Sequence, residues 1–197
     1  MYAAKNEKHL LCVVKGGGKP SNPRSKGFFN FGKMICWNRE YELGDEHNFS
    51  SSFEFWDSVR RDRDNMVILP LYLSKNGVSI SISTQRGDEH VGYIYADCES
   101  IKRELRFVDA EYKMQIAQKL LEEETQIYDY YLRGESYDCH LYDGRKMMVV
   151  CENIVGDCDI IKKFLRIELD IEYDELIDDL IIVPETENEY VSKWISD

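Results

Sequence analysis

Alternating apolar and polar positions in the first half of the chain predict a set of antiparallel strands. Residues 66–73 are almost wholly apolar, and residues 91–96 have the same character. The pair Asn76-Gly77 is typical of a two-residue hairpin turn, and the apolar residues after it alternate with serines: Val78, Ile80 and Ile82. Pro70 has no N–H to donate, so we expect its strand to lie at a sheet edge or to be bulged there.

A period of 3.6 residues predicts helices elsewhere in the chain. The longest should run from about Asp109, a suitable N-cap, to Arg133, because Gly134 is a typical helix terminator. Its apolar positions recur on one face, at Tyr112, Ile116, Leu120, Ile127 and Tyr131. Shorter helices are predicted over residues 50–63, 97–105 and 159–168.

A second hairpin is predicted around Asp143-Gly144, between residues 137–142 and 146–151. Residues 9–15 and 34–37 predict two further strands. Together these patterns predict an α+β fold, in which an antiparallel sheet built from hairpins carries packed helices on one side, with one long helix near 109–133. A chain of 197 residues is long enough for one sizeable domain, alone or with an appendage.

Charge is distributed very unevenly along the chain, whose net charge is −12. Residues 151–197 hold 14 acidic and four basic residues, whereas the first 33 residues hold seven basic residues and one acidic residue. We therefore divide the chain into a basic segment (1–33), a core domain (34–156) and an acidic element packed on the core (157–197). Such a gradient carries information about partners rather than about the fold.

The acidic region has the pattern of an ordered element. Between Asp170 and Asp179 the acids are interleaved with apolar residues, namely Ile171, Tyr173, Leu176 and Ile177. Only residues 185–197 have the composition of a loosely held tail, with Trp194 as a possible anchor. Carboxylates fixed on a scaffold present a defined charge pattern, which a disordered tail does not.

Two acidic groups are therefore candidates for binding a partner. One is predicted on the long helix, at Glu122, Glu123 and Glu124, and the other in the C-terminal region, at Asp170, Glu172, Asp174, Glu175, Asp178 and Asp179. The alternative is a solvated face that only confers solubility. A pI near 4.9 argues against general nucleic-acid binding, which requires a basic stripe.

Several classes of protein are not indicated. There is no run of 18 apolar residues and no signal-peptide pattern, so we expect a cytoplasmic protein. The glycines before Lys19 fit neither phosphate-binding motif and predict a connector. Six scattered cysteines predict free thiols and neither a disulfide framework nor a paired metal motif: Cys12, Cys36, Cys98, Cys139, Cys151 and Cys158. We predict no metal and no cofactor.

The best candidate for catalysis is the segment from Gly44 to Asn48. It holds His47 beside Asp45 and Glu46, an imidazole next to two carboxylates in a polar loop. Neighbouring side chains on an extended chain point in opposite directions, so a structural loop is the favoured interpretation. Likewise, the aromatics beside Arg24 and Lys26, namely Phe28, Phe29 and Phe31, are either a stacking surface for nucleic acid or anchors in the core.

Several segments resemble a family of uncharacterised proteins found in phages and conjugative elements of low-GC Gram-positive bacteria. The matching motifs are MICWNREY from Met34, LGDEHN from Leu43, ILPLYL from Ile68 and GYIY from Gly92. A further match covers the region from Glu124 to Tyr137, so the resemblance spans roughly residues 34–156. Arg39 stands where the family pattern leads us to expect His, which weakens a metal or catalytic role for this segment.

The resemblance implies a mobile-element accessory protein that acts in a bacterial cytoplasm. Together with the acidic region it predicts a counter-defence protein, a non-enzymatic inhibitor whose nucleic-acid-mimicking surface binds a basic host effector. Two alternatives remain. One is a small-molecule or nucleotide-binding protein, or an enzyme, that uses the loop from Cys36 to Asn48 with basic residues of the N-terminal segment. The other is an interaction module with no role in defence.

Overall fold

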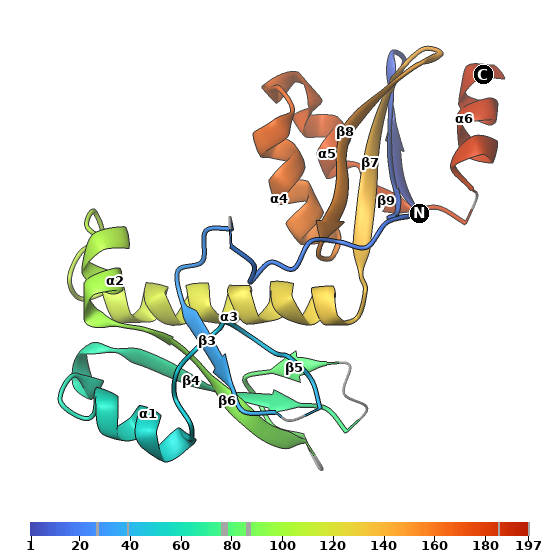
Figure 1. Ribbon diagram of the computed structural model, residues 1–197. Helices are drawn as coiled ribbons and strands as arrows, with labels where there is room; N and C mark the ends of the chain where they lie inside the picture. Colours follow the sequence, from blue (N-terminus) through green and yellow to red (C-terminus); the bar gives the residue numbers. More distant parts are fainter. Residues whose placement is uncertain (27, 39, 76–78, 86–87, 185, 197) are drawn as a thin grey trace. The chain divides into compact units, whose positions relative to one another are not determined.

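The computed structural model describes the chain from Met1 to Ser196, apart from residues 27, 39, 76–78, 86–87 and 185. The chain forms two compact units (Figure 1). The central unit comprises residues 22–133. The terminal unit comprises residues 1–21 and 134–197, because a strand from the N-terminal segment pairs with a strand that follows residue 133. The units therefore cut across the predicted segments 1–33, 34–156 and 157–197.

The central unit is built on a four-stranded antiparallel sheet in the order β3-β6-β4-β5. Its strands are β3 (Lys33–Cys36), β4 (Val67–Leu73), β5 (Ile80–Ser81) and β6 (Glu89–Ala96). Its helices are α1 (Ser52–Val59), α2 (Cys98–Glu104), α3 (Lys113–Leu132) and the short 3-10 helix η1 (Arg63–Asn65).

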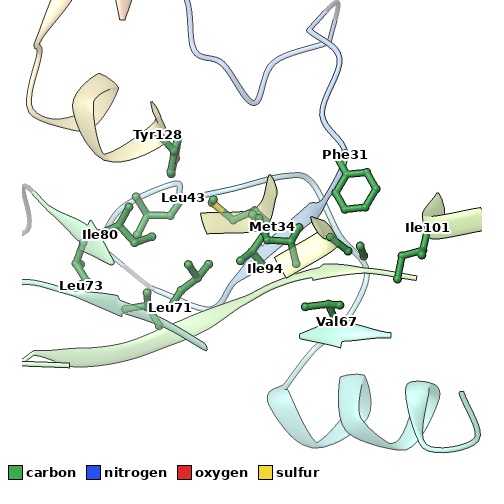
Figure 2. Close-up of a cluster of buried hydrophobic side chains, with 14 of the residues drawn as sticks. Phe31, Met34, Leu43, Val67, Leu71, Leu73, Ile80, Ile94, Ile101 and Tyr128 are labelled. Carbon is green, nitrogen blue, oxygen red and sulfur yellow. The ribbon is translucent and has the colours of Figure 1, made fainter. Parts of the chain in front are cut away.

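Helices cover both faces of this sheet. On one face, Leu121 and Tyr128 of α3 pack with strand residues such as Met34 and Ile94, and Figure 2 shows this cluster around the sheet. On the other face, Phe55 of α1 is fully buried in a second cluster. Apolar residues on both faces of β3 and β6 are thus buried, as expected for a sheet that lies between two layers.

The terminal unit contains a five-stranded antiparallel sheet in the order β8-β7-β2-β1-β9. Its strands are β1 (Tyr2–Lys5), β2 (His9–Lys15), β7 (Ser136–Asp143), β8 (Lys146–Val155) and β9 (Ile181–Ile182). Its helices are α4 (Cys158–Glu168), η2 (Ile171–Tyr173), α5 (Asp174–Asp178) and α6 (Glu187–Ser196).

Helices again lie on both faces of the sheet (Figure 1). Leu11 and Leu141 on one face pack with Ile161 and Leu165 of α4 and with the apolar residues of α5. The opposite face, which includes Leu10, packs against α6 through three half-buried side chains: Tyr190, Val191 and Trp194. The sheet is therefore the middle layer of this unit.

The α+β class and the long helix are confirmed. The predicted single sheet with helices on one side was wrong, because the strands form two sheets that each have helices on both faces. The long helix ends before Gly134, whose φ of 68° fits the predicted terminator. Pro70 pairs only with β6, since β5 reaches no further than Tyr72, and the ladder is bulged after Leu71.

Three other predictions have mixed outcomes. The Asn76-Gly77 turn lies outside the described residues. The C-terminal segment that we expected to be loosely held is the helix α6, anchored by Trp194 as anticipated. The strands β1 and β9 were missed, because four and two residues are too short for a clear alternation.

In the described part of the chain, no helix has the length and apolar character needed to cross a membrane.

Candidate functional site

The acid-rich segment 170–179 is an ordered part of the terminal unit. It forms η2 and α5, and its Leu176 and Ile177 side chains are only 3% and 0% exposed. Both pack in the core with Ile161 and Leu165 of α4. The prediction of an ordered amphipathic element is confirmed, and burial of these two side chains holds the intervening carboxylates in place.

The carboxylates of this segment face solvent. Asp174 is partly exposed, and the other five are exposed: Asp170, Glu172, Glu175, Asp178 and Asp179. Arg166 of α4 donates a hydrogen bond to the Asp178 carboxylate, and Lys162 Nζ donates to the Asp178 carbonyl oxygen over 2.8 Å. These bonds tie α5 to α4, so the two helices present their charges as one surface.

Two large apolar side chains lie beside these acids. Ile171 is 86% exposed, and Ile167 at the end of α4 is 79% exposed. Of the apolar residues interleaved with the acids, Leu176 and Ile177 are buried, whereas Ile171 in η2 faces solvent. We call the six acids of residues 170–179 together with Ile167 and Ile171 the acidic surface. The two isoleucines add exposed apolar area beside the carboxylates.

The acids of the long helix belong to the central unit and differ from one another. Glu122 is half-buried and accepts a hydrogen bond from Gln118 Nε2 over 2.8 Å, whereas Glu123 is exposed. Glu124 faces inward: its carboxylate accepts hydrogen bonds from the backbone N–H groups of Phe31 and Gly32. Burial raises the pKa of Glu124, although these bonds and Arg24 act in the opposite direction. Glu124 therefore has a structural role.

Arg24 joins three segments of the central unit through a guanidinium that is only 1% exposed. Its Nε and Nη2 atoms donate to the two carboxylate oxygens of Asp45 over 2.9 and 2.5 Å. Its Nη1 donates to Glu124 Oε2 over 2.9 Å and to Asn30 Oδ1 over 3.0 Å. Its Nη2 also donates to the Gly32 carbonyl oxygen over 2.7 Å. These residues form the Arg24 network, which no local pattern in the sequence indicates.

Asp45 therefore has no carboxylate oxygen left for catalysis. Besides Arg24, it accepts a hydrogen bond from the Met34 N–H over 2.8 Å, and its own N–H donates to the Met34 carbonyl oxygen over 2.7 Å. Gly44 beside it has a φ of 74°, and a Cβ there would lie 2.6 Å from the Met34 carbonyl oxygen. The loop geometry places Asp45 against β3, which is the structural role we favoured from the sequence.

His47 is held in an aromatic setting. Its Nε2–H donates to the Cys36 carbonyl oxygen over 2.9 Å, and its ring stands edge-on to Trp37 at 5.4 Å. Within the described residues, its buried Nδ1 atom has no hydrogen-bond partner. Burial, with a smaller effect of Asp45, raises the pKa of the Cys36 thiol to about 12, so Cys36 is not a thiolate nucleophile near neutral pH.

A polar cavity of about 620 Å³ lies beside this loop. Its lining includes His47 and the exposed Glu46, together with the following residues: Asn22, Cys36, Asn38, Glu40, Tyr41, Glu42, Leu43, Gly44 and Asp45. Arg39 lies outside the described residues. The guanidinium of Arg24 is enclosed in its network, so it is not available to a ligand in this cavity.

The aromatic residues near Arg24 were expected either to anchor in the core or to form a stacking surface for nucleic acid, and the structure separates them. Phe31 is buried in the core, as an anchor, whereas Phe28 and Phe29 are exposed. Because the Arg24 side chain is enclosed, Lys26 is the exposed one of the two cations next to these rings. This weakens the interpretation of the segment as a stacking surface for nucleic acid, which needs cations beside its aromatic rings.

No group of three or more His, Cys, Asp and Glu side chains is placed to hold a metal ion in the part of the chain that the structure describes. Comparisons of this chain with protein-family models, with curated proteins and with solved structures returned no match. The site must therefore be interpreted from its own geometry.

Proposed function

We propose that this chain is a non-enzymatic inhibitor that binds a basic, nucleic-acid-binding protein through the acidic surface. The observation that carries the proposal is a set of six carboxylates on a segment whose Leu176 and Ile177 are fixed in the core, next to the exposed Ile167 and Ile171. The resemblance to phage and conjugative-element proteins supports a host effector as the target and the bacterial cytoplasm as the place of action.

The chemistry of this surface fits such a partner. Its carboxylates would occupy a channel that normally receives phosphates, and the negative charge would speed association with a basic surface. The same charge would repel nucleic acid itself. The two isoleucines supply apolar area that is lost from water on contact, at about 25 cal/mol per Å². Glu122, Glu123 and Glu124 are not part of this proposal, because they lie in the central unit and Glu124 faces inward.

Neutralising the acidic surface should weaken binding. In the triple variant Asp170→Asn, Glu172→Gln, Glu175→Gln, three exposed carboxylates become amides of similar size. We expect the affinity for the partner to fall about tenfold or more at low salt, and the difference to shrink as salt rises. The partner is isolated by capture from a lysate of a low-GC Gram-positive bacterium on the immobilised chain, and Kd is then measured with the purified partner.

A matched variant controls for net charge. Glu7→Gln, Glu111→Gln, Glu152→Gln removes three exposed carboxylates outside the acidic surface, and it should leave Kd nearly unchanged. Duplex DNA added to the complex should release the chain from its partner, because both ligands use the same channel. Binding that is insensitive to salt, or equal loss of affinity in the two triple variants, would contradict the proposal.

A second candidate function is favoured by the cavity beside His47. We propose that it binds a small molecule bearing an amino or guanidinium group, because three exposed carboxylates that are not paired with Arg24 line it, those of Glu40, Glu42 and Glu46. The same lining would repel phosphates, which argues against the nucleotide in our sequence-based alternative.

Spermidine is a suitable cationic probe for this cavity. We expect a saturable titration by calorimetry, with an affinity about tenfold weaker in the variant Glu42→Gln, Glu46→Gln, since removing each charge weakens attraction to the cation. The variant Glu99→Gln, outside the cavity, should bind as the parent does. Absence of saturation, or tighter binding of ATP than of spermidine, would reject this candidate.

A further inference from the structure

Two cysteines face each other across neighbouring strands of the terminal unit. Cys139 on β7 and Cys151 on β8 are direct partners in the antiparallel register. Side chains at opposed positions lie on the same face of a sheet, with Cα atoms about 4.5 or 5.5 Å apart according to the hydrogen-bonding pattern. Both spacings fall in the range of about 4.4 to 6.8 Å that a disulfide spans.

Both cysteines are free thiols, and their side chains interact across the ladder. The Cys139 thiol makes a hydrogen bond to the Cys151 sulfur, and neither residue is in a disulfide. The ladder is irregular on both sides of Cys139, so the strands are locally freed from a strict pleat. The pair is thus opposed in the register, within a locally irregular stretch of the ladder.

Burial gives the two thiols different roles. Cys139 is fully buried in the core, whereas Cys151 is only partly buried. The hydrogen bond from Cys139 lowers the pKa of Cys151, and that bond together with burial raises the pKa of Cys139. Cys151 therefore deprotonates first and is the thiol that a reagent in solution reaches.

We propose that Cys139 and Cys151 form a reversible disulfide when the chain meets a low-molecular-weight disulfide of the glutathione class. The Cys151 thiolate attacks one sulfur of the reagent, forms a mixed disulfide and releases one thiolate. Cys139 then loses its proton to that thiolate and attacks the Cys151 sulfur. The second reagent thiolate leaves and takes up a proton from water. The two protein thiols are oxidised by two electrons, and the reagent is reduced to two thiols.

The remaining cysteines lack such a partner. Cys12 is opposite His140 in the register of β2 and β7, so its thiol meets no second cysteine across the ladder. Cys158 lies at the start of α4, and burial raises its pKa. Cys36 and Cys98 belong to the central unit. Oxidation should therefore select one pair. The proposed disulfide does not require the acidic surface to be a binding site. Cys139 packs in the same core cluster as residues of α4 and α5.

A tryptic map of the whole chain tests the proposal without any substitution. Arg145 and Lys146 lie between the two cysteines, so digestion separates them unless a disulfide holds the peptides together. After treatment with oxidised glutathione, we expect an intact mass lower by about 2 Da and a link between the peptide that holds Cys139 and the peptide 147–162, which holds Cys151 and Cys158. Further digestion with a protease that cleaves before aspartate separates Cys151 from Cys158 at Asp157, and the link should stay on the fragment that holds Cys151. Dithiothreitol should restore the mass and separate the peptides.

Two variants separate the steps of the reaction. In Cys139→Ser the mixed disulfide on Cys151 has no second thiol to resolve it, so a stable adduct of one glutathione is expected on residue 151. Cys98→Ser is the matched control and should form the disulfide as the parent does. If the parent chain also stops at the adduct, or if the map joins another pair of cysteines, the proposal is overturned. The map of the parent chain decides the matter even if Cys139→Ser does not fold.

Discussion

Replacing Arg24 by methionine should destabilise the central unit more than any other single substitution considered for this protein. The variant Arg24→Met is expected to lower the free energy of unfolding by about 3 to 5 kcal/mol, the usual cost of removing one partner from a buried ion pair. Methionine fills much of the same volume but leaves the inward-facing carboxylates of Asp45 and Glu124 without their counter-charge. It also removes the donors to Asn30 and to the Gly32 carbonyl oxygen.

The loss should depend on pH in a defined direction. Because burial already raises the pKa of Glu124, the folded state holds its proton more readily than the unfolded state, and removing Arg24 raises that pKa further. In Arg24→Met, the ionised Glu124 carboxylate therefore destabilises the folded state most at pH values above its pKa in that state. As pH falls from the pKa of Glu124 in the folded state towards its pKa in the unfolded state, Glu124 takes up a proton, and the variant should regain stability relative to the parent.

Urea unfolding curves followed at several pH values provide the measurement. Arg103→Met is the matched control, since Arg103 pairs with Glu104 at the surface, and this variant should unfold at nearly the same urea concentration as the parent. Equal effects of the two substitutions, or a gap between Arg24→Met and the parent that widens towards acid pH, would refute the structural role of the Arg24 network.

Adding a single methyl group at Gly92 is expected to have the second-largest effect. Gly92 on β6 is the register partner of Cys36 on β3, and a Cβ at this position would lie 1.9 Å from the Ile35 carbonyl oxygen. It would also approach the Cys36 Cα to 2.9 Å. Because the obstructing atoms are backbone, no rotamer change relieves the clash, and β3 must separate from β6. We expect Gly92→Ala to cost about 3 kcal/mol, the upper part of the usual range for overpacking.

Thermal unfolding and amide hydrogen exchange measure this effect. The amides that pair β3 with β6 should lose protection in Gly92→Ala. Gly17→Ala is the control, because a Cβ there would meet no atom within 4 Å, and its melting temperature should stay close to that of the parent. Full protection of β3 in Gly92→Ala would show that the strands tolerate the added methyl group.

These two predictions assign a structural role to two motifs that the sequence analysis singled out, LGDEHN and GYIY. In the LGDEHN segment, Gly44 turns the chain, Asp45 holds Arg24 and the Met34 N–H, and His47 bonds to the Cys36 carbonyl oxygen. In the GYIY segment, Gly92 permits the close approach of β3. Of the candidate catalytic groups, the Glu46 carboxylate and the Nδ1 atom of His47 make no hydrogen bond to another residue that the structure describes.

Local patterns allowed much of the fold to be predicted from the sequence. Apolar runs, strand alternation and helical periodicity are short-range properties, so they located β4, β6 and β7, the long helix α3 and the helix α4 to within a few residues. The same holds for the acidic segment: alternating acids and apolar residues correctly predicted an ordered element anchored at Leu176 and Ile177. The outward turn of Ile171 was not predictable, because a 3-10 turn breaks the helical period.

The sequence alone thus determined the α+β class, the long helix, the charge gradient and the ordered nature of the acidic region. The tertiary structure decided which distant segments share a sheet, that Glu124 faces inward to Arg24, and that Cys139 lies opposite Cys151. The reason is physical: periodicity depends on neighbours along the chain. Pairing, burial and contact between charges depend instead on residues 12 to 180 positions apart, which no local pattern records.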